Sequence, residues 1–298
     1  MNKNSGQTVQ EVSMKFTKMH GIGNDYVYVN CFEEELALDP GRLAELVSDR
    51  HFGIGSDGLI LIKPSEVADF CMDMYNSDGS RGSMCGNGIR CVAKYVYDHG
   101  MTNMTTIRVE TLAGIKTIDL TVKDGKVKLA NVDMGLPVLQ SKGIDTELTP
   151  EAQAEITSEM IWEALDVDGV EMMMIPISMG NPHAIFFIDD VNDLEIEKIG
   201  PAIEKNPRFP DRTNVEFVQI VDREHVKMRV WERGSGETMA CGTGACAVAV
   251  ACALAGYTEE QVDVRLLGGT LKITWNDENG HVEMCGPATE VFTGEFLV

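Results

Sequence analysis

Short apolar and β-branched stretches separated by glycine turns fill most of the first half of the chain. Residues 15–30 predict two strands joined by a glycine turn, and residues 59–63 and 69–75 predict two more. Residues 105–135 are rich in β-branched residues, and Asp124-Gly125 within them is a strong signal for a hairpin turn. This half therefore predicts a mainly antiparallel sheet.

The second half repeats the pattern after a polar stretch at about 135–158, which predicts an irregular connection. Its predicted elements are a strand, turn and strand over 172–190, a helix over 191–205, strands over 213–221 and 225–232, and a last pair of strands from 262 with a turn at Asn279-Gly280. In the first half, Asp39-Pro40 predicts the start of a helix that ends near Asp49.

Two further helices are each predicted to begin at a cysteine. Cys85-Gly86-Asn87-Gly88 precedes a helical run to about residue 98, and Cys241-Gly242-Thr243-Gly244 precedes the apolar run 245–255. The second helix has no charged residue between 242 and 258, and a helix that is apolar on every side must be buried on every side. We therefore expect an α+β fold in which a strongly curved sheet wraps around a central helix.

The two cysteine motifs belong to a longer internal repeat, in which three collinear segments align at an offset of 156 or 157 positions. The aligned pairs are Cys85 with Cys241, Asn76 with Glu232, Asn24 with Asn181, and Tyr26 with His183. A nearly constant offset over three segments indicates a duplication. It predicts two similar domains with a site between them.

Composition excludes several classes of protein. The 298 residues are 44% apolar and 24% charged, which is typical of a globular protein of about two domains. The formal net charge of −22 argues against nucleic acid and anionic membrane surfaces as partners. No apolar run is long enough to span a bilayer. Residues 1–13 are polar, so we expect a flexible extension there, no signal peptide and a cytoplasmic protein.

The eight cysteines predict neither a disulfide framework nor a metal site. A chain of this size without a secretion signal is not expected to be held by disulfides. The spacings Cys85-x5-Cys91 and Cys241-x4-Cys246-x5-Cys252 do not match the short spacing of structural zinc ligands. A cysteine at a helix start, by contrast, lies among free backbone N–H groups at the positive end of the helix dipole, which favours the thiolate.

Two such cysteines facing one another would suit stereochemical inversion at a carbon next to a carboxylate. A thiolate on one face removes a proton, and a thiol on the other face returns one. Backbone N–H groups at Gly86-Asn87 and Gly242-Thr243 could receive the charge that develops on the carboxylate. This chemistry requires no cofactor, and the sequence carries no nucleotide-binding glycine motif.

Six segments closely resemble the diaminopimelate epimerase family. They are KMHGIGNDY (18–26), RHFGIGSDG (50–58), NSDGS…MCGNGIRC (76–91), MGNPH (179–183), TNVEF (213–217) and ERGSGETMACGTGA (232–245). The resemblance departs at Gly58, where some members carry Gln. It implies a cofactor-independent isomerase that interconverts LL- and meso-diaminopimelate by a two-cysteine mechanism, in lysine and peptidoglycan precursor synthesis.

The same resemblance implies a set of site residues. Cys85 and Cys241 would be the base and the acid, with His183 and Glu232 tuning the thiols. The implied substrate-binding residues are Asn24, Asn76, Gly86, Asn87, Asn181, Asn214, Glu232, Arg233, Gly242 and Thr243. Arg233 would pair with the distal carboxylate of the substrate, and Glu232 would accept from an ammonium group.

The resemblance also implies two pseudo-symmetric domains, each a barrel-like sheet around a central helix. The expected N-terminal domain covers 14–133 and is completed by the strand 288–298, and the C-terminal domain covers 134–287. A homodimer is possible. Two alternatives stay open from the sequence, namely a racemase or epimerase of another amino acid on the same fold, and a non-catalytic amino-acid-binding relative. Arg233 and the four asparagines favour a substrate with a distal amino-acid group.

Overall fold

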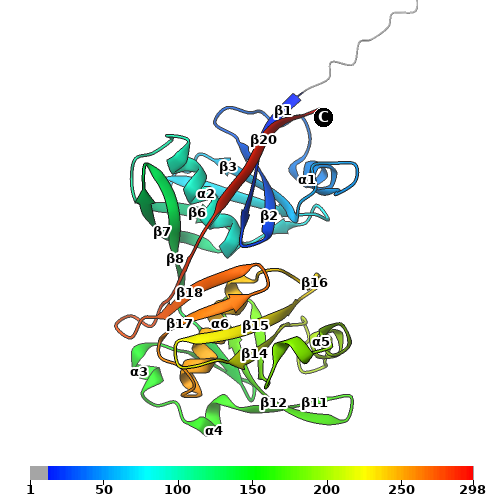
Figure 1. Ribbon diagram of the computed structural model, residues 1–298, viewed down its shortest axis with the longest axis vertical. Coiled ribbons are helices and arrows are strands. Elements are labelled where there is room, and N and C mark those ends of the chain that lie inside the picture. The colour runs from blue at the N-terminus through cyan, green and yellow to red at the C-terminus, as the bar shows by residue number, and fades with distance from the viewer. Residues whose placement is uncertain (1–12, 298) are drawn as a thin grey trace, which may run out of the picture.

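The computed structural model describes residues 13–297, which form two halves that lie one above the other in Figure 1. The extension predicted over 1–13 lies outside the described residues except for Ser13, which begins the first strand. Within 13–297, no helix has the length and apolar character needed to cross a membrane.

The first half consists of eight strands and two helices, together with the last strand of the chain. The strands are β1 (Ser13–Gly21), β2 (Asn24–Asn30), β3 (Gly58–Lys63), β4 (Phe70–Asn76), β5 (Arg81–Gly82), β6 (Thr106–Thr111), β7 (Gly114–Lys123) and β8 (Lys126–Gly135), and the helices are α1 (Pro40–Ser48) and α2 (Gly86–Asp98). β2–β3 and β4–β6 are parallel pairs, and the other pairs within this half are antiparallel.

The second half has the same order of elements. Its strands are β11 (Glu163–Val167), β12 (Val170–Ser178), β13 (Pro182–Phe187), β14 (Asn214–Ile220), β15 (His225–Glu232), β16 (Gly236–Glu237), β17 (Gln261–Leu266), β18 (Gly269–Trp275) and β19 (Val282–Gly286), and its helices are the short η1 (Val191–Asp193), α5 (Ile196–Glu204) and α6 (Gly242–Leu254). β13–β14 and β15–β17 are parallel, as their counterparts are in the first half. The repeat seen in the sequence is therefore a repeat of topology.

Two parts of the sequence prediction are wrong. The stretch at 135–158 is not irregular but contains β9 (Val138–Ser141), β10 (Ile144–Glu147), α3 (Pro150–Gln153) and the start of α4 (Ser158–Ile161). The β9–β10 turn places Lys142 at φ 54°, a conformation that lysine rarely adopts, so its first position lacks the Asn, Asp or Gly that usually signals a hairpin. The stretch 262–286 holds three strands rather than two, because β17 and β18 are joined by a tight turn at Leu267-Gly268.

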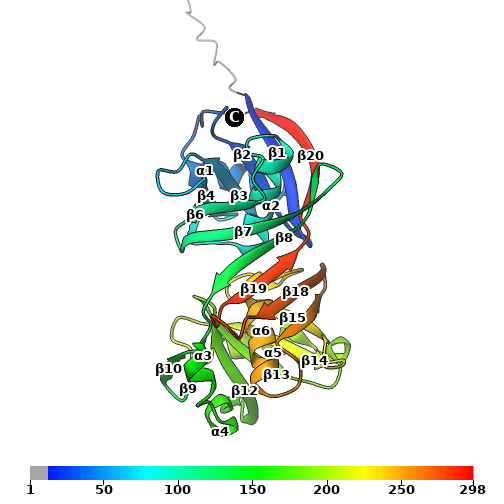
Figure 2. The ribbon, with the colours of Figure 1, turned by 90° about the vertical axis from the view of Figure 1, so that its left-hand side faces the viewer.

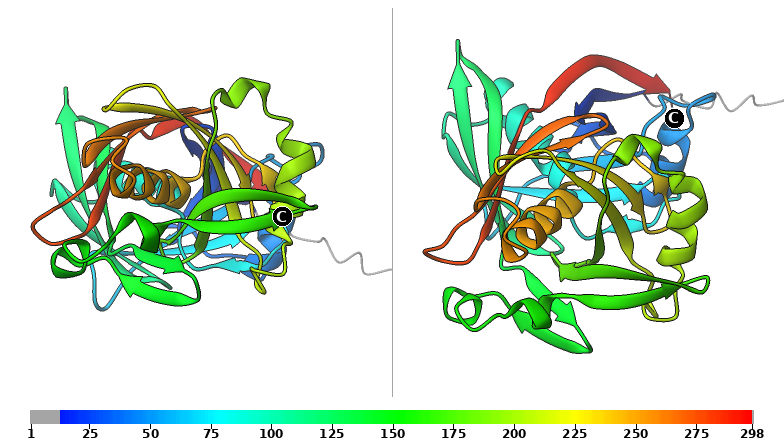
Figure 3. Two further views of the ribbon diagram at one scale, coloured as in Figure 1. Left: turned by 90° about the horizontal axis from the view of Figure 1, so that it is seen from below. Right: turned by 60° about the horizontal axis from the view of Figure 1, so that its bottom comes forward.

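Each half wraps its sheet around one helix, as Figure 3 shows for α6. α6 contacts β12, β13, β14, β17, β18 and β19, and its residues 244–252 are all buried. Its alanine, valine and cysteine side chains are short, so strands can pack closely on every side. The predicted fold class is confirmed.

The halves are joined by paired strands. β8 pairs antiparallel with β19 of the second half, and β20 (Thr289–Leu297) then returns to pair antiparallel with β1. Figure 2 shows this return as the strand that runs from the lower half to the top of the molecule. The two helix starts consequently lie at the junction between the halves.

Candidate active site

Each predicted catalytic cysteine is the N-cap residue of its helix. The Cys85 sulfur accepts a hydrogen bond from the Gly88 N–H at 3.3 Å, and the Cys241 sulfur accepts one from the Gly244 N–H at 3.4 Å. The backbone is extended at both caps, with φ −132° and ψ 115° at Cys85 and φ −119° and ψ 110° at Cys241. The two caps therefore repeat one local structure.

Glycine at the third helix position lets the backbone approach the sulfur. A Cβ on Gly88 would lie 2.6 Å from the Ile60 side chain. A Cβ on Gly244 would lie 2.6 Å from a carboxylate oxygen of Glu216 and 3.2 Å from the Cys241 sulfur. No larger residue fits at either position without a shift of its neighbours.

The starts of the two helices face one another across the junction. A Cβ built on Gly242 would lie 3.6 Å from the Gly86 Cα, and the Asn87 side-chain amide donates to the carbonyl of Ala240 at 3.1 Å. Met284 of β19 lies against both Gly86 and Gly242. The structure thus brings together the two glycines and the asparagine predicted to hold the reacting carboxylate.

A buried cation lies behind these helix starts. Arg90 of α2 is fully buried, and it donates to the Gly86 carbonyl at 3.2 Å, the Asn87 Oδ1 at 2.9 Å and the Pro287 carbonyl at 3.3 Å. Burial lowers its pKa. Arg90 therefore fixes the Asn87 side chain from beneath, a role that the sequence did not predict.

Around Cys85, the neighbouring side chains come from the first half. The thiol donates to the Asn24 Oδ1 at 3.3 Å, and the Asn24 amide donates to the Asp57 carboxylate at 2.8 Å. Burial raises the pKa of Cys85, although the Gly88 N–H and the Tyr26 hydroxyl lower it by hydrogen bonding. The sequence predicted that the helix start would favour the thiolate of Cys85. That prediction is wrong for the net pKa shift, because burial raises the pKa by more than the hydrogen bonds at the helix start lower it.

Around Cys241, a chain of hydrogen bonds leads into the core of the second half. The sulfur lies 3.6 Å from the Thr243 hydroxyl, which accepts from the Asn181 amide at 3.3 Å. The Asn181 Oδ1 lies 3.1 Å from Nε2 of His183, and Nδ1 of His183 lies 2.7 Å from Glu216. The His183 and Glu216 side chains are fully buried.

The thiol of Cys241 is more strongly perturbed than that of Cys85. Burial raises its pKa well above the ordinary value, and the carboxylates of Glu232 and Glu216 raise it further. Burial also raises the pKa of Glu232, although hydrogen bonds with Thr238 and Cys241 lower it. Glu232, predicted to tune the thiols, therefore does lie beside Cys241.

The other predicted substrate-binding residues lie at strand ends near the helix starts. Asn214 donates to the Pro182 carbonyl at 3.0 Å and accepts from the backbone N–H of Arg233 at 2.9 Å. The Arg233 guanidinium is exposed and donates to the Asp211 carbonyl at 3.2 Å. Asn76 ends β4 opposite Gly58, and its amide donates to Ser80 at 2.9 Å rather than to another predicted site residue.

Tyr26, Asp57 and Glu216 adjoin the site but were not among the predicted residues. The repeat paired Tyr26 with His183, so the signal for Tyr26 was present in the sequence. Asp57 and Glu216 reach the site through the parallel pairs β2–β3 and β13–β14, which local sequence does not reveal. In the described part of the chain, no group of three His, Cys, Asp or Glu side chains is placed to hold a metal ion.

Solved structures share this fold at low sequence identity. A phenazine biosynthesis protein of the PhzF family from Bacillus anthracis matches with a TM-score of 0.70 at 16% identity, over 96% of this chain and 100% of its own. A hydroxyproline epimerase from Agrobacterium vitis matches with a TM-score of 0.63 at 14% identity, over 96% and 91%. The chain thus shares the fold of these two proteins.

Sequence comparison identifies the family. The diaminopimelate epimerase family model matches residues 16–140 and 175–291. A diaminopimelate epimerase of Acetivibrio thermocellus is 58% identical over 95% of this chain and 98% of its own length, and one of Methanococcus maripaludis is 54% identical over 95% and 99%. The chain belongs to the diaminopimelate epimerase family, which confirms the resemblance read from the six segments.

Proposed function

We propose that the chain is a diaminopimelate epimerase, an isomerase that interconverts LL- and meso-diaminopimelate and supplies lysine and peptidoglycan precursor synthesis. The observation that carries the proposal is the pair of capping cysteines, Cys85 and Cys241, on two helices that meet at the junction of the halves. The full-length similarity to proteins named diaminopimelate epimerase supports the choice of substrate.

In the proposed reaction, the two cysteines act on opposite faces of the α-carbon. One thiolate breaks the C–H bond and keeps the proton as a thiol, while the other thiol protonates the carbon from the opposite face and becomes a thiolate. The protonation states of Cys85 and Cys241 are exchanged after each turnover, and the reverse reaction uses them in the opposite roles. The raised thiol pKa values support this, because a thiolate formed in a buried site is a stronger base.

The negative charge that develops on the substrate is received at the helix starts. Backbone N–H groups at Gly86-Asn87 and Gly242-Thr243 would bind the carboxylate attached to the reacting carbon. Loss of one such donor typically costs about 3 kcal/mol of transition-state stabilisation. Because these donors belong to rigid helices, they need no rearrangement as the charge forms.

The distal amino-acid group of the substrate is proposed to bind at the surrounding strand ends. Arg233 has an exposed guanidinium that can take the distal carboxylate as a bidentate pair. Asn24, Asn76, Asn181 and Asn214 supply amide donors and acceptors, and Glu232 can accept from an ammonium group. A small apolar amino acid would leave these groups unpaired, which favours diaminopimelate over such a substrate.

Three broader expectations accompany this function. We infer a reducing, cytoplasmic location, since the eight cysteines are all free thiols and a catalytic pair must stay reduced. We retain the division into domains 14–133 with 288–298 and 134–287, which the β1–β20 pairing supports. A homodimer is expected from the family, and sedimentation of the purified protein tests it.

Proton NMR of the reduced protein with LL-diaminopimelate in heavy water tests the function. We expect loss of the α-proton signal and appearance of the meso isomer without an added cofactor. A folded protein with titratable thiols that exchanges no α-proton would contradict the proposal. Selective turnover of a different amino acid in a substrate panel would instead assign a racemase or epimerase of that amino acid, and binding without exchange would assign a binding protein.

A further inference from the structure

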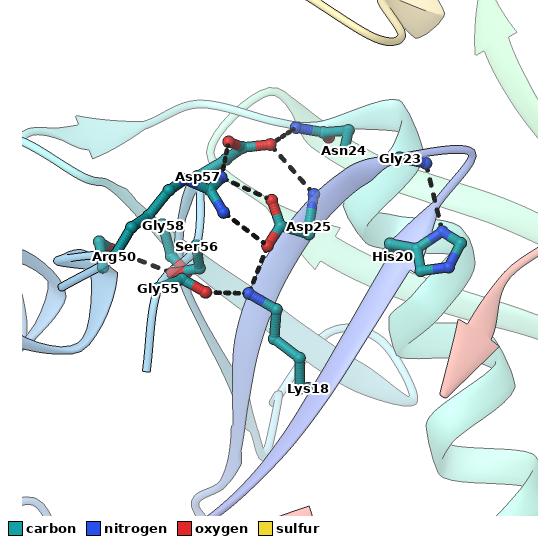
Figure 4. A network of polar contacts seen from close by, with 11 residues as sticks. Lys18, His20, Gly23, Asn24, Asp25, Arg50, Gly55, Ser56, Asp57 and Gly58 are labelled. Carbon is teal, nitrogen blue, oxygen red and sulfur yellow. Dashed lines mark hydrogen bonds and ion pairs between the residues drawn. The ribbon is translucent and has the colours of Figure 1, made fainter. Parts of the chain in front are cut away.

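A network of charged side chains lies directly behind Asn24 (Figure 4). One oxygen of Asp57 accepts from the Asn24 amide at 2.8 Å and from the Asp25 N–H at 3.0 Å, and the other accepts from Arg50 at 2.9 Å. Arg50 also pairs with Asp25 at 2.9 Å, and Lys18 pairs with Asp25 and donates to the Gly55 carbonyl. Two carboxylates and two cations therefore balance one another in this network.

Asp57 determines which way the Asn24 amide points. The three groups around the Asp57 carboxylate are all N–H donors, so it serves as an acceptor on every side. Burial raises its pKa and the nearby Asp25 carboxylate adds to the rise, while the Asp25 N–H, the Asn24 amide and the charge of Arg50 offset only part of it. Because Asn24 must turn its NH₂ group toward Asp57, its carbonyl oxygen faces the Cys85 sulfur at 3.3 Å.

Asn181, the equivalent asparagine in the second half, has its side-chain amide in the opposite orientation. The carbonyl oxygen of Asn181 lies against Nε2 of His183, and its NH₂ group donates to Thr243 beside Cys241. Thr243 accepts this bond, so its own hydroxyl proton is free to point at the Cys241 sulfur at 3.6 Å. The two asparagines thus direct an acceptor toward one thiol and a donor chain toward the other.

We propose that Asp57 is a positioning residue for Cys85, because through Asn24 it holds a hydrogen-bond acceptor against the thiol and favours its protonated form before substrate binds. A hydrogen bond to the neutral form of an acid disfavours its ionisation. The inference rests on the proposed function in one respect only, since a protonated Cys85 is the form that can act as an acid in epimerisation.

Other groups also face Cys85 and stay in place when Asp57 is changed. The Tyr26 hydroxyl from β2 and the N–H groups of Asn87 and Gly88 from α2 favour the thiolate, whereas the Glu232 carboxylate from β15 disfavours it. The contribution of Asp57 can therefore be measured as a difference on a constant background.

The test substitutes Asp57→Asn and follows alkylation of Cys85 by iodoacetamide across pH, with the peptide quantified by mass spectrometry. An asparagine cannot accept from three N–H donors, so Asn24 is released to turn its NH₂ group toward the sulfur. We expect the apparent pKa of Cys85 to fall by about one unit, so that alkylation below that pKa is about tenfold faster. We also expect kcat for epimerisation to fall more than KM changes.

Asp25→Asn is the matched control. It removes one carboxylate from the same network and the partner of Lys18 and Arg50, but Asp25 makes no side-chain bond to Asn24. We expect lower stability with an unchanged alkylation profile for Cys85. Equal shifts of the Cys85 pKa in both variants would overturn the proposal and indicate a simple charge effect. A wild-type alkylation profile in Asp57→Asn would also overturn it, because Asp57 would then have no effect on Cys85.

Asn24→Ala keeps the test available if Asp57→Asn does not fold. It removes the acceptor and leaves the charged network intact, so the apparent pKa of Cys85 should fall in the same direction, and no fall would overturn the proposal. Because alkylation is measured without substrate, its outcome is independent of the NMR test of diaminopimelate turnover.

Discussion

At the residue scale, each site cysteine is the N-cap residue of its helix, a position where the side chain usually offers an oxygen to the free N–H groups. Ser, Thr, Asp and Asn are the favoured N-cap residues, and replacing them by Ala costs about 1 kcal/mol of stability. Sulfur is a weaker acceptor, and the N–H to sulfur distances here are 3.3 and 3.4 Å. The caps of α2 and α6 are therefore suboptimal for the helix and suited to proton transfer.

Serine at these positions should separate catalysis from stability. In Cys85→Ser and Cys241→Ser, a hydroxyl can still cap the helix, but its much higher pKa prevents it from serving as the base. We expect epimerisation to fall by about 10²- to 10⁴-fold while the melting temperature is kept or raised. Cys252→Ala, in the buried middle of α6, is the control and should lose some stability but keep its activity. Full activity in either serine variant would refute the two-base assignment.

Gly244, whose N–H donates to the Cys241 sulfur, has no room for a larger side chain. In Gly244→Ala, the new Cβ would approach Glu216 to 2.6 Å and the sulfur to 3.2 Å, so we expect a loss of kcat that exceeds the loss of stability. Gly256→Ala at the other end of α6 is the control, because φ is +71° there and no atom lies within 4 Å of the new Cβ. It should cost about 1 to 2 kcal/mol in unfolding and leave kcat unchanged. Equal kcat in both variants would contradict this explanation.

At the scale of elements, the sequence correctly predicted those features that depend on the local pattern of residues. The helices begin at Asp39-Pro40, Cys85 and Cys241 as expected, since caps and apolar periodicity are local signals. The β9–β10 hairpin was missed because its turn has Lys142 where Asn, Asp or Gly usually precedes the glycine. Likewise, the cysteines and asparagines of the site were predicted from motifs. Asp57 and Glu216 were not, because their closeness to the site depends on which strands lie side by side.

Asp73 on β4 links three strands and makes stability depend on pH. Burial raises the pKa of Asp73, but ion pairs with Lys63 of β3 and Arg81 of β5 outweigh it and hold the pKa below the ordinary value of 3.8. A lowered folded-state pKa adds stability above 3.8, and this stability is lost as pH falls through the folded-state pKa.

Asp73→Asn should remove part of this dependence. We expect the free energy of unfolding at neutral pH to fall by about 1 to 2 kcal/mol, because the partners are partly exposed and screened. The difference between variant and wild type should shrink as pH falls below 3.8. Urea unfolding at several pH values measures it, and a constant difference would show that the ion pairs do not carry the effect.

At the scale of the whole molecule, the junction between the halves makes the site open to oxidation. The helix starts approach so closely that a Cβ on Gly242 would lie 3.6 Å from the Gly86 Cα. We expect diamide to form a Cys85–Cys241 disulfide after a small movement of the halves, to abolish activity, and to be reversed by dithiothreitol. Peptide mapping locates the bond, and Cys241→Ser is the control that cannot form it. Full activity with this disulfide in place would show that the thiols do not flank the substrate.

The pairing of β1 with β20 also bears on how the chain is made. About 270 residues separate the end of β1 from the start of β20, so at 5 to 20 residues per second a ribosome needs on the order of 15 to 50 s to add the partner strand. During that time β1 presents one edge of unpaired N–H and C=O groups, a template for aggregation. A nascent chain that stops before β20 would therefore leave β1, which was synthesised first, without its partner strand.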